Sequence, residues 1–160
     1  MSILVRPMAE GEAGAVAAMV AALARDTGAA LVPKLTAEAL AQARDLVEVL
    51  VAETADQRLA GACLSLMTFS TWRGSRGLYV VDLFVAGEAR GHGIGLLLLR
   101  EAARRGWRRG ARFVKLEVDI DNEGAARFYA RQAFSRKETD RLFVLEAEAL
   151  EQFIAEEDRA

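Results

Sequence analysis

Residues 78–95, LYVVDLFVAGEARGHGIG, place an almost continuous apolar run directly before a glycine-rich turn. The run from Leu78 to Ala86 is rich in β-branched and aromatic residues, which is typical of a strand buried on both faces. We therefore expect it to be the central strand of a sheet. After the turn, apolar side chains recur at helical spacing as far as Trp107, so the segment predicts a strand, a turn and a helix in succession.

The pattern on either side of this segment predicts a mixed α/β sheet with helices packed on its faces. The stretch VEVLVAET can extend a helix capped by Thr36 or form a strand, and we favour the strand because RLAGACLSLMTF supplies a hairpin partner. The expected strands are ILVRPM (3–8), these two arms of the hairpin, the central strand, RFVKLEVDI (112–120) and a region near 134–145. The expected helices are 13–25 ended by Gly28, one capped by Thr36, one after the glycine turn, one capped by Asp121 or Asn122 as far as about Gln132, and a short one from Glu146.

Length and composition narrow the function classes. A chain of 160 residues, just over half of them apolar, suits one domain over 1–160. The lack of a leader and of a long apolar run predicts a soluble cytoplasmic protein with no membrane partner. Cys63 and His92 are the only residues of their kinds, which excludes an intrachain disulfide and a zinc site with several histidines, so we expect no metal. A net charge of −2 predicts no nucleic-acid partner.

Arginines are concentrated near the end of the helix that follows the glycine turn. We interpret them as a solvated helix terminus whose dipole favours cations, and a role in holding a phosphorylated cofactor is the alternative. The residues are Arg100, Arg104, Arg105, Arg108, Arg109 and Arg112.

The glycine turn itself predicts an anion site. At a helix N-terminus, unpaired backbone N–H groups and the helix dipole point at the same spot. Gly91, Gly93 and Gly95 remove Cβ atoms, so a pyrophosphate can approach the backbone closely, and Arg90 can add a guanidinium from the rim. A dinucleotide fingerprint is excluded by Leu96 at the position of its third small residue, and a P-loop by leucines where it needs Gly-Lys.

Two motifs carry a resemblance to a known family. Arg90, Gly93 and Gly95 form Arg-x-x-Gly-x-Gly, and DNEGAARFYARQAF follows at residues 121–134. Together they resemble the coenzyme A loop and the second signature of the GNAT superfamily of N-acetyltransferases. The resemblance implies a mixed, mostly antiparallel twisted sheet with helices on both faces, and acetyl-CoA as cosubstrate.

By the same resemblance, the backbone of residues 83–85 pairs with the pantetheine arm, the Val85 N–H polarises the thioester carbonyl, Asn122 contacts coenzyme A and Tyr129 protonates the departing thiolate. The family's Gly-Phe pair is Ala133-Phe134 here, which weakens the helix end. The residues implied to bind the cosubstrate are Leu83, Phe84, Val85, Arg90, Gly91, His92, Gly93, Ile94, Gly95, Leu96, Asn122, Ala125 and Tyr129.

Residues 78–95 and the ending RLFVLEAEALEQFIAEE are similar to the spermidine/spermine (diamine) acetyltransferase branch. That branch has a carboxylate where Val81 stands, so the acceptor can differ. Its members pair through their C-terminal elements, which implies a homodimer here.

Amine acetylation requires a base. Asp82 is the first candidate because burial in an apolar strand raises a carboxyl pKa, although a buried aspartate satisfied by local donors is an equal alternative. Glu117 and Asp119, on one face of the next strand, are second candidates or solvated carboxylates. We therefore expect an acetyl-CoA-dependent N-acetyltransferase acting on a small-molecule primary amine. The alternatives are a protein or peptide N-acetyltransferase and a non-catalytic acetyl-CoA-binding regulatory module.

Overall fold

The computed structural model of the chain describes residues 2–30 and 32–155. These residues form two compact units, Met1–Asp119 and Ile120–Ala160. The first contains β1 (Ile3–Pro7), α1 (Ala13–Thr27), α2 (Ala37–Gln42), β2 (Glu48–Thr54), β3 (Leu59–Ser70), β4 (Ser75–Val85), the 3₁₀ turn η1 (Gly87–Ala89), α3 (Ile94–Arg108) and β5 (Ala111–Leu116). The second contains α4 (Glu123–Arg131) and α5 (Ala147–Ala155).

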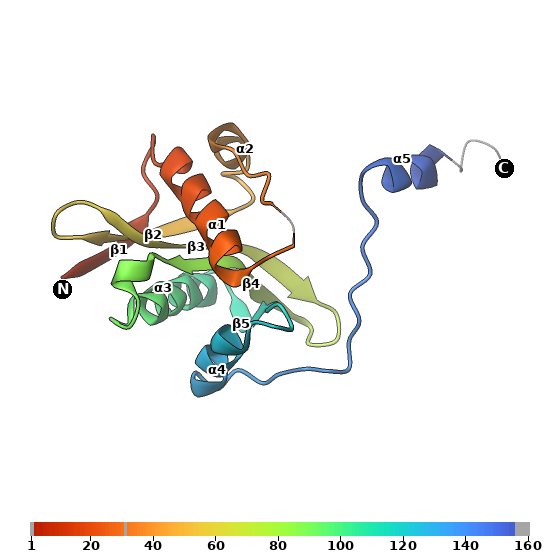
Figure 1. The fold of residues 1–160 in the computed structure, drawn as a ribbon. Helices are drawn as coiled ribbons and strands as arrows, with labels where there is room; N and C mark the ends of the chain where they lie inside the picture. Colours follow the sequence, from red (N-terminus) through yellow and green to blue (C-terminus); the bar gives the residue numbers. More distant parts are fainter. Residues whose placement is uncertain (1, 31, 156–160) are drawn as a thin grey trace. The chain divides into compact units, whose positions relative to one another are not determined.

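The five strands form one sheet in the order β1-β2-β3-β4-β5 (Figure 1). The first three pairs are antiparallel, and β4 and β5 are parallel because α3 crosses over between them. The expected mixed, mostly antiparallel sheet is confirmed. The strand expected to be central is the fourth of the five, while β3, the longer arm of the hairpin, takes the middle place.

Helices cover both faces of the sheet, as expected. The α1 face carries Ala62 and Leu64 of β3, which join Val16 and Val20 of α1 in one hydrophobic cluster. The opposite α3 face carries the alternate residues of β3, and there a Cβ on Gly61 would lie 3.1 Å from a methyl group of Leu98 in α3. The period-two alternation of the strands thus separates the two layers of core.

Helix boundaries follow local capping chemistry. Gly28 ends α1 with φ 66°, in the left-handed region that favours glycine. Thr36 caps α2, because its Oγ1 accepts a hydrogen bond from the N–H of Ala39 at 3.1 Å. The helix then stops at Gln42, and β2 begins at Glu48, which confirms the strand interpretation of VEVLVAET.

In the second unit, α4 ends in a Schellman motif formed around an alanine. The N–H of Phe134 donates to the carbonyl of Tyr129 at 3.2 Å, and the N–H of Ala133 donates to the carbonyl of Ala130 at 3.1 Å. Ala133 adopts φ 63°, which is strained for a residue with a Cβ. The rings of Tyr129 and Phe134 meet edge to face at 5.5 Å between centroids, which supplies the apolar contact of the motif.

Two expectations for the C-terminal third are wrong. The strand predicted near 134–145 does not form, and those residues are irregular between α4 and α5. Apolar content alone cannot make a strand, because each strand needs a hydrogen-bonded neighbour and the four strand pairings of the sheet include none for this segment. The strand predicted over 112–120 ends at Leu116, so Glu117 and Asp119 lie beyond it and do not share a strand face.

We predict that Ala133→Gly stabilises the protein by about 1 kcal/mol, because glycine adopts the left-handed conformation without the Cβ penalty. The measurement is urea-induced unfolding of the full chain. Ala18→Gly, on the exposed side of α1, is the matched control and should destabilise by roughly 0.5–1 kcal/mol. An equal loss of stability in both variants would contradict the strain assigned to Ala133.

Candidate active site

An unpaired strand edge is the first element of the site. The parallel pairing of β4 with β5 ends at Val80 and Leu116, while β4 continues to Val85. A β-bulge opposite Leu64 and Ser65 of β3 gives β4 one extra residue, Val81, at the point where β4 separates from β5. Beyond the bulge, β4 is hydrogen-bonded to β3 alone.

The hydrogen-bond pattern shows which groups this edge presents. The N–H of Ala86 donates to the carbonyl of Ala60 at 2.9 Å, on the β3 side. Backbone groups alternate in direction along a strand, so Leu83 and Val85 direct theirs away from β3, toward the open edge. The Val85 carbonyl accepts a hydrogen bond from Nε of Arg90 at 3.0 Å, which leaves the N–H of Val85 at that edge as a donor.

The glycine turn forms the second element. Gly91 and Gly93 adopt φ 80° and 76°, and a Cβ at either would have nothing within 4 Å. Gly93 is the N-cap of α3 and has no side chain to cap it, so the first N–H groups of the helix remain available to an anion. His92 is held within the turn, since its Nδ1 lies 3.0 Å from the Arg90 carbonyl. These features are those that the sequence predicted for an anion site.

Arg90 has a partner that the sequence did not reveal. Its guanidinium forms an ion pair with Asp26 in the last turn of α1, in addition to the bond to Val85. An anion bound at the turn must therefore compete with this carboxylate for Arg90. One sequence signal could have indicated the pair: an acidic side chain at a helix C-terminus is unfavourable to the dipole and calls for a cation.

Ionisable groups gather on the α1 face where β4 and β5 part. Asp82 is half-buried, and burial raises the pKa of its carboxyl above the ordinary value. Tyr79 stands beside it, and burial, the charge of Glu117, a hydrogen bond to Glu117 and the charge of Asp82 together raise the pKa of the phenol. The structure thus brings Asp82 and Glu117 to one aromatic ring, and Tyr79 is a site residue that sequence reasoning missed.

The second signature motif lies in the other compact unit and forms α4. The side chain of Asn122 caps this helix by accepting a hydrogen bond from the N–H of Ala125 at 3.0 Å. Tyr129 packs against Phe128 at 5.0 Å between ring centroids, and against Phe134 on its other side. Its orientation is therefore fixed by two aromatic neighbours within its own unit.

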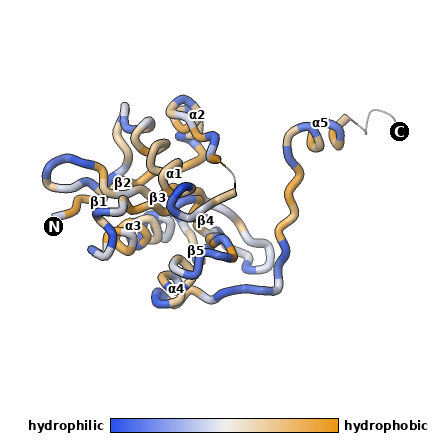
Figure 2. The backbone as a smooth tube through the Cα atoms, in the orientation of Figure 1, coloured by the Kyte–Doolittle hydropathy of each residue, from blue (hydrophilic) through white to orange (hydrophobic). Residues whose placement is uncertain are grey.

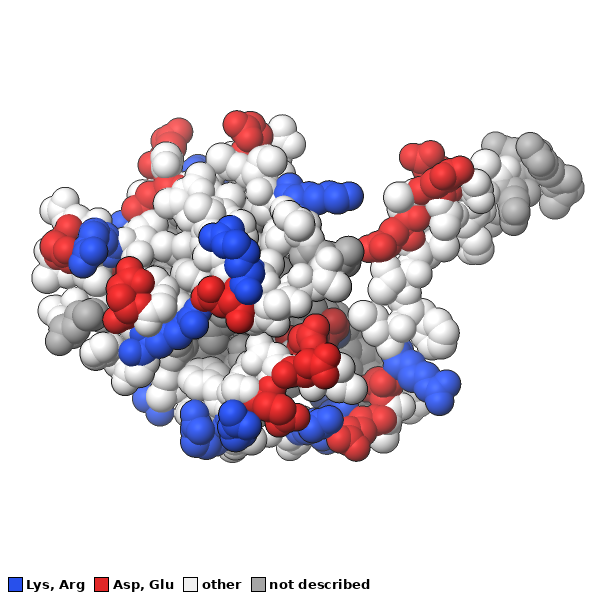
Figure 3. All heavy atoms as spheres, in the orientation of Figure 1, with Lys and Arg blue, Asp and Glu red and all other residues white. Residues whose placement is uncertain are grey.

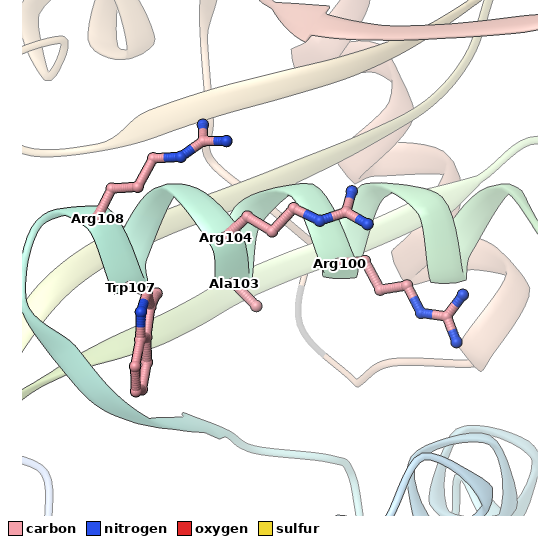
Figure 4. Close-up of a pocket in the computed structure, with 5 residues that line it drawn as sticks. All are labelled: Arg100, Ala103, Arg104, Trp107 and Arg108. Atoms are coloured by element: carbon pink, nitrogen blue, oxygen red, sulfur yellow. The ribbon is translucent and has the colours of Figure 1, made fainter.

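Several members of the arginine cluster have defined partners. Arg105 and Arg109 form ion pairs with Glu48 of β2, and Arg112 stacks on Trp107 with its guanidinium 4.2 Å from the ring centroid. The face drawn in Figure 3 shows acidic and basic side chains interspersed. A surface hollow of about 530 Å³ has a lining that comes from α3 alone, and Figure 4 shows the five side chains that line it. It is lined by Arg100, Ala103, Arg104, Trp107 and Arg108.

Over residues 2–30 and 32–155, no group of three or more acidic, cysteine or histidine side chains is placed to hold a metal ion. No helix in that part of the chain is long and apolar enough to cross a membrane. Cys63 is buried, and burial raises the pKa of its thiol to about 12, as expected of a core residue.

Comparison with known proteins places this geometry in a family. The pattern of the acetyltransferase (GNAT) family matches residues 16–134, most of the chain. The chain belongs to the GNAT family. A segment of 57 residues is 42% identical to an uncharacterized N-acetyltransferase of Methanocaldococcus jannaschii; it covers 36% of this chain and 25% of that relative.

Two solved structures share the fold. An integron cassette protein of Vibrio cholerae aligns with a TM-score of 0.77 at 21% identity, over 96% of this chain and 98% of that one. A probable acetyltransferase aligns with a TM-score of 0.74 at 21% identity, over 92% and 99%. At these identities the likeness establishes the fold alone.

Members of the GNAT family use acetyl-CoA, and the site suits it. A pantetheine arm carries amide groups that can pair with an open strand edge, which β4 presents from Val81 to Val85. A pyrophosphate suits backbone N–H groups in a turn free of Cβ atoms, which Gly91 and Gly93 provide. The two features follow each other directly along the chain.

We predict that Asp26→Asn tightens binding of coenzyme A up to about fivefold, because it removes the carboxylate that competes for Arg90. Arg90→Gln should weaken binding about tenfold by removing a charged donor. Isothermal titration calorimetry at low salt measures both. Asp56→Asn, which breaks the exposed Asp56–Arg58 pair at the β2–β3 turn, is the matched control and should change nothing. Weaker binding by Asp26→Asn would instead show that Asp26 holds Arg90 in place.

Proposed function

We propose that this chain is an acetyl-CoA-dependent N-acetyltransferase that transfers an acetyl group to a primary amine of a small molecule by direct attack in a ternary complex. The observation that carries the proposal is the open edge of β4 that leads directly into the glycine turn. Acetyl-CoA supplies the activated acetyl group. The chain supplies the binding edge, a donor for the acetyl carbonyl and groups that move protons.

The amine must first lose a proton. An alkylammonium has a pKa of about 10.4, so producing the free amine at pH 7 costs about 4–5 kcal/mol. Asp82 is our candidate base, acting directly or through water, because its raised pKa makes it a better proton acceptor than a solvated carboxylate. Glu117 lies on the other side of Tyr79 and is the second candidate.

The N–H of Val85 is our candidate donor to the acetyl carbonyl. It points to the open edge, and Arg90 fixes the carbonyl of the same residue, so this stretch of backbone is held in place. A donor fixed before the reaction stabilises the developing oxyanion without reorganisation. Leu83 directs its backbone groups to the same edge and is assigned to the pantetheine arm.

Tyr129 is our candidate acid for the departing thiolate, an assignment that rests on the signature motif at residues 121–134. Tyr129→Phe removes the proton donor and keeps the aromatic contacts of the ring with Phe128 and Phe134. In the same way, Asn122 is assigned to coenzyme A through its amide N–H₂, since its oxygen is engaged in capping α4.

The first experiment follows free thiol release from acetyl-CoA with polyamines, amino acids, aminoglycosides and peptides as acceptors. We expect turnover with small amines and a loss of about 10²-fold or more in kcat for Tyr129→Phe, the range typical of a lost general acid. Turnover restricted to peptides would favour a peptide N-acetyltransferase. Tight binding of acetyl-CoA with no turnover would leave only a binding module.

We also predict the pH dependence of kcat/KM. A base works when deprotonated, so kcat/KM should fall as the pH is lowered through the raised pKa of Asp82. Asp82→Asn should abolish this fall of kcat/KM at low pH, the acidic limb of the profile, and should lower kcat/KM at high pH. Glu123→Gln, at an exposed carboxylate in the first turn of α4, is the control and should keep the limb. A limb that persists in Asp82→Asn would transfer the role to another group, with Glu117→Gln as the next variant.

The finer assignments belong to the same proposal. Similarity to the spermidine/spermine branch makes polyamines one acceptor class to test, although Val81 replaces the carboxylate of that branch. We propose a cytoplasmic homodimer that forms through the C-terminal elements. The apolar stretch 142–145, visible in Figure 2, supports it, because Phe143 is 88% exposed and Leu142 is 73% exposed. Sedimentation velocity of the full chain and of Phe143→Ser distinguishes dimer from monomer.

A further inference from the structure

A second pocket lies on the first unit at the turn between β3 and β4. Its volume is about 240 Å³, and its lining comes from the turn and the neighbouring strands. Arg73 of the turn and Lys115 of β5 are the two cations that face it, and Phe113 and Thr68 contribute to the wall. The mechanism proposed above uses none of these residues.

Aromatic rings hold both cations. The Arg73 guanidinium lies 4.7 Å from the centroid of the Phe113 ring, and Nζ of Lys115 lies 5.4 Å from the centroid of the Tyr79 ring. Within the described residues, neither cation forms an ion pair with a carboxylate. Two positive charges without counterions therefore flank one pocket, and this favours an anionic group as its occupant.

The backbone is shaped to keep this arrangement. Gly77 lies beneath Phe113, and a Cβ at Gly77 would approach the ring to 2.2 Å. Glycine therefore lets the Phe113 ring lie against the sheet with its other face toward Arg73. The turn is held as well, because Oγ of Ser70 accepts a hydrogen bond from the backbone N–H of Arg73 at 3.2 Å.

The register places the pocket and Asp82 on the same face of the sheet. Leu64 pairs with Asp82, Leu66 pairs with Tyr79, and alternate residues of β3 share a face, so Tyr79 and Asp82 do too. Lys115 pairs with Tyr79 across the parallel strands. The α1 face thus carries the pocket at one end and Asp82 at the other.

Charge changes sign along this face. β4 and β5 run in the same direction. Arg73 precedes the stretch over which they pair, Lys115 lies near the end of that stretch opposite Tyr79, and Glu117 and Asp82 come after it. Tyr79, opposite Lys115, and Asp82 are three residues apart, or roughly 10 Å along an extended strand. A diamine carries two positive charges and fits only the carboxylate end of this surface.

We infer that the acceptor carries a carboxylate as well as its amine, and that Arg73 and Lys115 bind this carboxylate while the amine lies at Asp82. The inference rests on the proposed N-acetyltransferase function. The separation of the two ends requires an amine several bonds away from the carboxylate. The side-chain amine of lysine or ornithine meets this requirement, and so does a peptide that ends in either residue.

The test compares kcat/KM for matched acceptors by thiol release. L-Lysine and L-ornithine are paired with cadaverine and putrescine, which lack only the carboxylate. The peptide Gly-Gly-Lys is paired with its C-terminal amide. We expect kcat/KM for each acceptor with a carboxylate to exceed that of its matched partner by about tenfold or more, which is the contribution expected of a charged contact. A preference seen only with L-lysine and L-ornithine would identify a free amino acid as the acceptor. A preference that Gly-Gly-Lys shares over its amide would also admit the C-terminus of a peptide.

Variants locate the contact. Arg73→Gln and Lys115→Met should each lower kcat/KM for L-lysine about tenfold, mainly by raising KM. The same variants should change kcat/KM for cadaverine by less than about threefold. Both residues are exposed, so the fold should tolerate the changes. Arg73→Glu should reverse the preference toward cadaverine. Arg58→Gln, at the exposed β2–β3 turn, is the matched control and should leave both acceptors unchanged.

The outcomes separate the two proposals. Equal kcat/KM values for diamines and amino acids, with no effect of the Arg73 and Lys115 variants, would overturn this inference and leave the N-acetyltransferase function intact. Equal losses for lysine and cadaverine would assign the two cations to general structure and also overturn it. Bound acetyl-CoA with no turnover of any amine would overturn the proposed function and this inference together.

Discussion

The parting of β4 from β5 is the constraint on which the rest of the site depends. Five residues of β4 continue past the last pairing, at Val80 and Leu116, with backbone groups that need partners. An open edge normally invites aggregation, but this one is short and follows a bulge at Val81 that turns it away from β5. The amide groups of the proposed ligand would pair with this edge. The same extension of β4 beyond β5 would then determine both the local fold and the proposed binding site.

The glycine turn also exposes backbone groups, in this case those at the N-terminus of α3. Both elements offer backbone N–H groups to the proposed ligand, so the proposed site requires few special side chains. Arg90 links the elements by binding the Val85 carbonyl, and its second partner, Asp26, adds the end of α1 to the arrangement. The exposed ion pair contributes about 1 kcal/mol at most, so an anion can replace the carboxylate readily. The pair is therefore better understood as a contact that an anion can replace than as a source of stability.

Local chemistry made much of this predictable from sequence. The stops and caps at Gly28, Thr36 and Asn122 depend on neighbours a few residues away, and each was predicted at the right residue or between two adjacent ones. The hairpin of β2 and β3 was predicted because two β-favouring runs flank a polar turn. The strand near 134–145 was wrong because its existence depends on a distant partner. Tyr79 and Asp26 were missed for the same reason, since register and tertiary contact bring them to the site.

The same difference between local and distant determinants applies to the two proposed binding sites, for the cosubstrate and for the acceptor. The proposed binding of coenzyme A through a strand edge and glycines corresponds to a compact sequence motif, so it could be predicted from sequence alone. The proposed recognition of the acceptor depends on side chains that are brought together by the pairing of three strands and by one bulge. Shifting the register by one residue would move Tyr79 and Lys115 to the α3 face and leave Asp82 with a different surface. The proposed acceptor chemistry therefore depends on register, and the order of charges from Arg73 to Asp82 becomes visible only when the strands are paired.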